Sequence, residues 1–135
     1  MNEQRDASDS VISDRQHCLI LVDDEQLLLD IATDTLEDAG YRVIAFKSPQ
    51  QVLIYLQQHQ DIDLLITDVE MPEVMSGIEL AKQAVALHPK LVVLTLSGRD
   101  LTSAEALLLT GIQHRHLNKP YRYDDLLFAV GQLLK

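Results

Sequence analysis

The sequence is poor in cysteine and in basic residues. Its single cysteine, Cys18, excludes an internal disulfide and a metal cluster built from several thiolates. Only 11 Lys and Arg stand against 21 Asp and Glu, which gives a formal net charge of −10. A nucleic-acid surface needs clustered Lys and Arg, so no direct contact with nucleic acid is expected. The acidity is compatible with a divalent cation or with a basic protein patch.

Long apolar runs are also missing. No run approaches the roughly 18 to 20 residues that a membrane span requires, and residues 1–17 lack the basic start and apolar segment of a secretion signal. With the single cysteine, these absences favour a cytoplasmic protein without membrane contact. Residues 1–16 are polar and predict a flexible tail. Residues 17–135, in a chain that is 47% hydrophobic, are long enough for one domain with a buried core.

Short apolar runs alternate with longer segments of helical periodicity after the tail. Uninterrupted apolar strands between helices predict a parallel sheet that is covered by helices on both faces. The weakest expected strand lies within residues 112–118, which are polar, so it should be an edge strand or line a site. The other expected strands are the runs CLILV, YRVIAF, DLLIT and LVVLTL.

The first expected helix lies in the segment EQLLLDIATDTLEDAG. Leu28, Ile31, Thr35 and Ala39 recur at helical spacing, which predicts that they share one face, and Gly40 supplies a stop. The later helices are expected in SPQQVLIYLQQHQ, SGIELAKQAVALHP, LTSAEALLLTG and YDDLLFAVGQLLK.

Polar side chains stand where four of the expected strands end. Asp23 and Asp24 follow the first strand, Asp68 the third, Ser97 the fourth and Lys119 the fifth. The carboxyl ends of parallel strands meet at one edge of a doubly wound sheet, where such folds bind ligands. Separate segments therefore bring acids, a hydroxyl and an amine to one place.

The chemistry of that edge follows from its charge. Two carboxylates some 5 Å apart repel by roughly 3 kcal/mol at an effective dielectric near 20, so three of them require a cation. Oxygen ligands favour Mg²⁺, which keeps several waters and accepts one or two carboxylates and a phosphate. A carboxylate beside such an ion is a suitable nucleophile toward phosphorus and would form an aspartyl phosphate.

Five motifs together carry a family resemblance. In their order and spacing, the residues are similar to the receiver domain of bacterial two-component response regulators, over about residues 18–135. The resemblance implies a flavodoxin-like α/β three-layer sandwich, with a five-stranded parallel sheet of order 2-1-3-4-5 and five helices. The motifs are LILVDDE, LLITDVEMP, GIELA, LTLSG and NKP.

The resemblance also implies roles for the acids. Asp68 occupies the position of the phosphoacceptor, and Asp24 that of a direct Mg²⁺ ligand. Asp23 would be a ligand through water, and the backbone carbonyl of Glu70 a further ligand.

On the other strands, Lys119 would pair with the phosphoryl group, ahead of Pro120, which the family usually holds in the cis form. Ser97 matches the Thr or Ser switch position.

Two positions depart from the usual family pattern. The loop DVEMPEVMSG holds one residue more than usual before Gly77, a feature similar to receivers of hybrid sensor kinases. His116 stands where the family usually has Tyr or Phe as the partner of the switch hydroxyl. It is either a switch residue, which would be sensitive to pH, or an ordinary solvated histidine at a strand edge. The side chains of Glu70 and Arg99 flank the site and are either tuning residues or simply solvated.

The implied function is a signalling switch and not a turnover enzyme. A sensor kinase or phosphotransfer protein would donate the phosphoryl group from a phosphohistidine, and the chain would act alone or as part of a longer regulator or hybrid kinase. A haloacid-dehalogenase-like phosphatase is a rival, but it needs an aspartate where Glu70 stands. A receiver-like binding module without phosphorylation would lack one of the site residues, and all are present.

We expect a downstream protein partner to bind the face formed by the fourth helix, the fifth strand and the fifth helix. Formation of a homodimer is a further possibility. Leu107, Leu108 and Leu109 cannot all face inward from one helix, so one of them should be exposed on that surface.

Overall fold

The computed structural model describes residues 16–72 and 74–135. The predicted tail over residues 1–16 therefore lies almost wholly outside the described residues. The strands are β1 (Cys18–Val22), β2 (Arg42–Phe46), β3 (Leu64–Asp68), β4 (Val92–Ser97) and β5 (His114–Asn118). The helices are α1 (Gln26–Asp38), α2 (Pro49–Gln58), α3 (Gly77–Leu87), α4 (Ser103–Leu108) and α5 (Tyr123–Leu133).

All five strands pair in parallel, in the order β2-β1-β3-β4-β5. β1, β3 and β4 are buried along their whole length, as their uninterrupted apolar runs predict. The polar β5 lies at one edge of the sheet and, among the described residues, pairs with β4 alone, Val93 opposite His114. The predicted flavodoxin-like sandwich and its strand order are confirmed.

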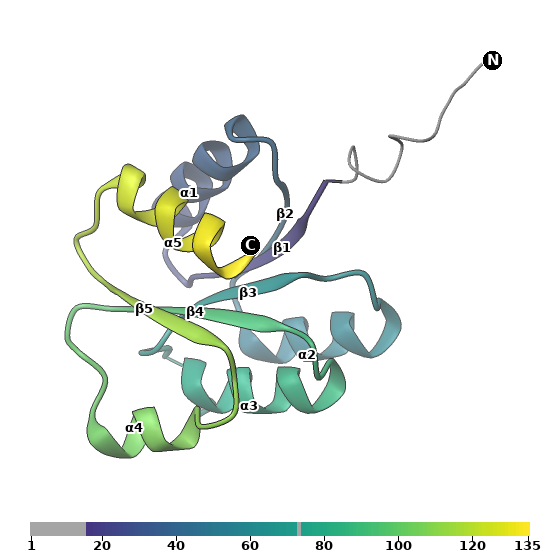
Figure 1. Cartoon of the computed structure of the whole chain (residues 1–135), viewed down its shortest axis with the longest axis vertical. Helices are drawn as coiled ribbons and strands as arrows, with labels where there is room; N and C mark the ends of the chain where they lie inside the picture. The colour runs from purple at the N-terminus through teal and green to yellow at the C-terminus, as the bar shows by residue number, and fades with distance from the viewer. Residues whose placement is uncertain (1–15, 73) are drawn as a thin grey trace.

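The helices form the two outer layers of the sandwich (Figure 1). α1 and α5 lie side by side over one face, where Leu19, Leu36 and Val130 belong to one apolar cluster. α2 and α3 cover the other face, and α4 follows beside α3. Because helices cover both faces, the central strands β1, β3 and β4 can present polar groups to solvent only at their ends.

Three helices begin at a capping side chain. Ser48 accepts from Gln51 N–H ahead of α2, whose first residue is a proline, and Ser76 accepts from Glu79 N–H ahead of α3. Thr102 and Glu105 form a reciprocal capping box at α4, which satisfies two amides that the helix leaves free. At the other end of α1, Gly40 has a φ of +99°, a conformation that favours glycine, so the predicted stop is confirmed.

The buried face of α1 is not the face that the sequence pattern picked out, but lies about one residue away from it. The buried residues are Leu29, Ala32 and Leu36. Three consecutive leucines open the helix, so more than one phase of the pattern fits the sequence, and packing on β1 and α5 selects the phase. The expected set, which the structure leaves exposed or half-buried, is Leu28, Ile31, Thr35 and Ala39.

α4 is shorter than predicted and leaves two leucines exposed where one was expected. Leu107 is 74% exposed and Leu108 46%, whereas Leu109 is fully buried. The helix ends at Leu108, and the chain then turns so that Leu109 packs into a cluster with Ile78 and Val93. Across the described ranges, no helix combines the length and the apolar character that crossing a membrane demands.

Candidate functional site

Three aspartates meet at the carboxyl edge of the sheet. Asp23 and Asp24 directly follow β1, and Asp68 is the last residue of the neighbouring β3. One carboxylate oxygen from each residue lies within 4.8 Å of the others. Asp23 and Asp68 are buried, whereas Asp24 is exposed and opens the cluster to solvent. The edge predicted from the sequence thus brings the three acids together.

Lys119 supplies the positive charge beside the buried acids. Its Nζ lies 2.6 Å from Asp68 Oδ1 and 3.5 Å from Asp23 Oδ2. Burial raises the pKa of Asp68 and so does Asp23, while Lys119 lowers it, and the net result is a pKa of about 7. Burial by itself lowers the pKa of Lys119, but the two carboxylates outweigh it and the net pKa is raised. One amine therefore does not balance three acids.

This donor set fits a hard divalent cation. Carboxylate oxygens are the ligands that Mg²⁺ prefers, and Mg²⁺ needs only one or two of them in addition to water. Asp23, Asp24 and Asp68 could hold such an ion, and its positive charge would favour the ionised form of Asp68, whose pKa is raised by burial and by Asp23.

The backbone around the acids is closely packed. Asp23 Oδ1 accepts from the Glu25 N–H at 2.9 Å, which orients the carboxylate. At Gly77, the first residue of α3, an added Cβ would lie 1.7 Å from the carbonyl oxygen of Asp68, so only glycine fits there. The Lys119–Pro120 peptide is cis, as the family resemblance implied.

Ser97 and His116 meet on the neighbouring strands β4 and β5. Ser97 Oγ donates to the carbonyl of Arg99 and lies 3.2 Å from His116 Nε2. His116 Nε2 also lies 2.9 Å from that carbonyl, which can only accept, so Nε2 carries the proton. Nδ1 then accepts from the hydroxyl of Thr95 at 2.7 Å. His116 is half-buried, and its ring lies within hydrogen-bond distance of Thr95, Ser97 and the Arg99 carbonyl.

Two features of this region were missed by the sequence reasoning. Thr95, buried inside an apolar strand, gave no signal that its hydroxyl bonds His116. Arg99 is not simply solvated: its guanidinium is paired with Glu70 and Glu105. The spacing Thr-x-x-Glu at residues 102–105 is a readable capping signal, but nothing local links it to Arg99.

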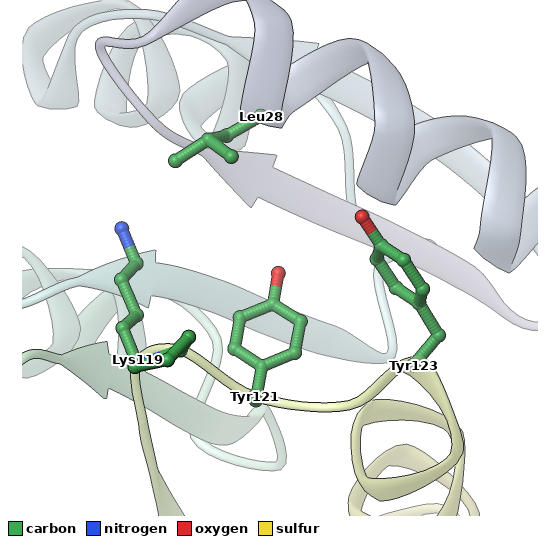
Figure 2. A pocket seen from close by; sticks show the side chains of 5 residues that line it. Leu28, Lys119, Tyr121 and Tyr123 are labelled. Carbon is green, nitrogen blue, oxygen red and sulfur yellow. The ribbon is translucent and has the colours of Figure 1, made fainter.

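A pocket of about 370 Å³ lies beside Lys119. Figure 2 shows Leu28 on α1 facing the side chains of Lys119, Tyr121 and Tyr123 across it. Its lining is mostly apolar, and burial raises the pKa of Tyr121, so that hydroxyl stays neutral at physiological pH. The charged cluster of the site is therefore bordered by an apolar surface, which we call the apolar flank and which is formed by Leu28, Pro120, Tyr121 and Tyr123.

A doubly wound α/β domain with three acids and a lysine at the carboxyl edge of its sheet defines the phospho-accepting receiver class. The model of the response regulator receiver domain family matches residues 19–131. The chain belongs to this family, which acts in two-component signalling and generally binds Mg²⁺ in an acidic pocket.

Individual relatives agree with this assignment. The chain is 34% identical over 119 residues to the heme response regulator HssR of Staphylococcus saprophyticus, covering 87% of this chain and 51% of HssR. It is 29% identical over 116 residues to the receiver protein CpdR of Brucella abortus, covering 86% and 95% of the two chains. It thus spans about half the length of one relative and nearly all of the other.

A solved structure gives the same result. The receiver domain of the hybrid histidine kinase CckA superposes with a TM-score of 0.72 at 29% identity, covering 87% of this chain and 99% of that chain. The findings support a phospho-accepting receiver and not a haloacid-dehalogenase-like phosphatase.

Proposed function

We propose that Asp68 accepts a phosphoryl group from a phosphohistidine of a sensor kinase or phosphotransfer protein. Mg²⁺ would be held by Asp23, Asp24, Asp68 and the backbone carbonyl of Glu70. The observation that carries this proposal is the cluster of three carboxylates within 4.8 Å, with the amine of Lys119 2.6 Å from Asp68. Of the two buried acids, Asp68 lies closer to the amine of Lys119 than Asp23 does.

The transfer forms one bond and breaks another. A carboxylate oxygen of Asp68 attacks phosphorus, the P–N bond of the donor breaks, and its electron pair goes to the donor imidazole nitrogen. Lys119 stays beside Asp68 and pairs with the negative oxygens of the arriving group. Mg²⁺, when bound, supplies further neutralisation of the phosphoryl charge.

The acyl phosphate on Asp68 would be removed by hydrolysis. Water attacks phosphorus, the bond from phosphorus to the Asp68 oxygen breaks, and the carboxylate is regenerated together with inorganic phosphate. This slow, self-catalysed step makes the domain a switch and not a turnover enzyme. The rival phosphatase reaction would need an aspartate acid where Glu70 stands, and Glu70 is engaged with Arg99.

Phosphorylation would change the hydrogen bonds on the side of the site formed by β4 and β5, which we call the switch side. Ser97 would leave the Arg99 carbonyl and turn its hydroxyl toward the phosphoryl group, and His116, already turned inward, would follow the space that Ser97 vacates. α4 and β5 would then shift between two arrangements.

Two surfaces fit the protein partners. The donor must reach the buried Asp68, and the apolar flank with Leu28 and Tyr123 is the adjoining surface on which it could rest. A downstream partner or a second copy would use the face of α4, β5 and α5. There Leu107 and Phe128 are exposed, and Arg115 lies over the Phe128 ring. We place the protein in the cytoplasm, as a stand-alone receiver or as part of a longer regulator or hybrid kinase.

The proposal is tested by phosphorylation from a small donor. The protein is incubated with acetyl phosphate and Mg²⁺, and intact mass spectrometry should find the mass gain of one phosphoryl group. Asp68→Ala should remove that gain completely. Asp61→Ala, which changes an exposed aspartate near the opposite end of β3, should retain it. Equal modification of the wild type and Asp68→Ala would refute the assignment.

A further inference from the structure

Arg99 connects two acidic side chains across the site. Its guanidinium lies 2.7 Å from Glu70 Oε2, and it binds both oxygens of Glu105 at 2.8 Å each. Glu70 belongs to the β3–α3 loop beside Asp68, whereas Glu105 is in the first turn of α4. A two-pronged contact of this kind fixes the orientation of the guanidinium plane. One side chain therefore joins the acidic loop to α4.

Glu105 has a second role in the same position. Its Oε1 accepts from the Thr102 N–H at 2.9 Å, as part of the capping box of α4. Arg99 and the Thr102 amide together lower the pKa of Glu105 to about 2, so the carboxylate is charged at every physiological pH. The ion pair between Arg99 and Glu105 therefore persists across the physiological pH range. Because Glu105 also belongs to the capping box, the ion pair links Arg99 to the first turn of α4.

The backbone of Arg99 is held as well. Its carbonyl accepts from Ser97 Oγ and from His116 Nε2, and its N–H donates to Ser97 Oγ at 3.2 Å. The residue that holds the Ser97 hydroxyl is thus the same residue whose side chain bridges Glu70 and Glu105. Ser97 cannot turn its hydroxyl toward Asp68 without giving up a bond to Arg99.

We propose that Arg99 and Glu105 are positioning residues that hold Ser97 in its unphosphorylated arrangement. This inference rests on the proposed phosphorylation of Asp68. The ion pair with Glu105 fixes the β4–α4 loop, the fixed loop presents the Arg99 carbonyl to Ser97, and release of Ser97 requires the loop to move. A receiver whose Glu105 cannot pair with Arg99 should therefore adopt the phosphorylated arrangement more readily.

The variant Glu105→Gln distinguishes the two roles of Glu105, its ion pair with Arg99 and its part in the capping box of α4. Glutamine still forms a capping box at this position, so α4 keeps its cap while the charge that holds Arg99 is lost. The matched control is Glu79→Gln, which removes the same charge from the corresponding first-turn position of α3, behind the serine cap Ser76 where α4 has Thr102. Both variants should stay folded and melt within a few degrees of the wild type.

The measurement is the affinity for beryllofluoride, a phosphoryl mimic, in saturating Mg²⁺ by titration calorimetry. Glu105→Gln should bind about two- to fivefold more tightly than the wild type, a range set by what exposed ion pairs contribute. Glu79→Gln should bind like the wild type. In an Arg99→Gln background, adding Glu105→Gln should change the affinity no further, because the partner through which Glu105 acts is gone.

The outcomes separate this inference from the proposed function. If the wild type binds no beryllofluoride, the phosphorylation proposal itself fails. If the wild type binds and Glu105→Gln binds equally or more weakly, the positioning role of Arg99 and Glu105 is refuted. An equal gain in both the wild-type and the Arg99→Gln backgrounds would also refute it, because Glu105 would then act without Arg99.

Discussion

The two sides of the site differ in how their polar groups are satisfied. On the acidic side, formed by β1 and β3, three carboxylates meet a single amine, and burial holds the pKa of Asp68 near 7. On the switch side, formed by β4 and β5, the side chains of Ser97, Thr95 and His116 all have hydrogen-bond partners. The acidic side therefore carries excess negative charge, whereas the polar side chains of the switch side are already hydrogen-bonded.

This difference indicates what each side does. Excess negative charge attracts a cation and, once the cation is bound, a phosphoryl group, so we propose that the acidic side performs the chemistry. A satisfied network responds only by exchanging one set of bonds for another, which is the behaviour of a two-state element. The following predictions test that division, from the largest expected effect to the smallest.

Removing the amine should affect the acidic side most. Lys119→Met leaves Asp23 and Asp68 as buried, unpaired charges, so the free energy of unfolding at pH 8 with a chelator should fall by about 3 kcal/mol. Urea titration measures this, and saturating Mg²⁺ should restore much of the loss. Lys82→Met, at an exposed lysine of α3, should stay within about 0.5 kcal/mol of the wild type. A similar loss of unfolding free energy in both variants would show that the pairing of Lys119 with Asp23 and Asp68 does not stabilise the fold.

The stability of the chelator-treated protein should fall as pH rises. Unfolded Asp68 loses its proton near pH 4, whereas the folded residue keeps it to about pH 7, so folding binds a proton between these values. Asp68 should therefore remove on the order of 3 kcal/mol across that window. Asp68→Asn should lack this component in urea titrations at several pH values. A wild type and a variant with parallel pH profiles would contradict the raised pKa.

Mg²⁺ should stabilise the folded protein through the acidic side. An ion present at a hundred times its dissociation constant adds about 2.7 kcal/mol if it binds only the folded state. The rise in Tm at pH 8 measures this, and Asp24→Asn should reduce it while leaving the Tm with chelator nearly unchanged, because Asp24 is exposed. A full response to Mg²⁺ in Asp24→Asn would remove that residue from the ligand set.

Changing the switch side should have the smallest effect. His116→Phe keeps an aromatic ring but loses the bonds to Thr95 and to the Arg99 carbonyl, which should cost about 1 kcal/mol of unfolding free energy. Phosphorylation by acetyl phosphate, followed by intact mass, should still occur. Loss of phosphorylation in this variant would break the division between a chemical side and a switching side.

Much of the site could be predicted from the sequence because it depends on local order. Apolar runs followed by Asp23, Asp68 and Ser97 place those residues at strand ends, the polar fifth strand ends before Lys119, and parallel strands must share that edge. The direction of His116 and the partners of Arg99 could not be predicted in this way. They are contacts between separate loops and strands, and no periodicity within one segment encodes them.

The sequence by itself determined the alternation of strands and helices, the cap at Ser48, and the set of residues at the carboxyl edge. Each of these follows from spacing along a single segment. Only the tertiary structure decided the buried face of α1, the exposure of Leu107 and Leu108, the raised pKa of Asp68 and the link from Arg99 to Glu105. These depend on which distant segments pack together and on how much water they exclude.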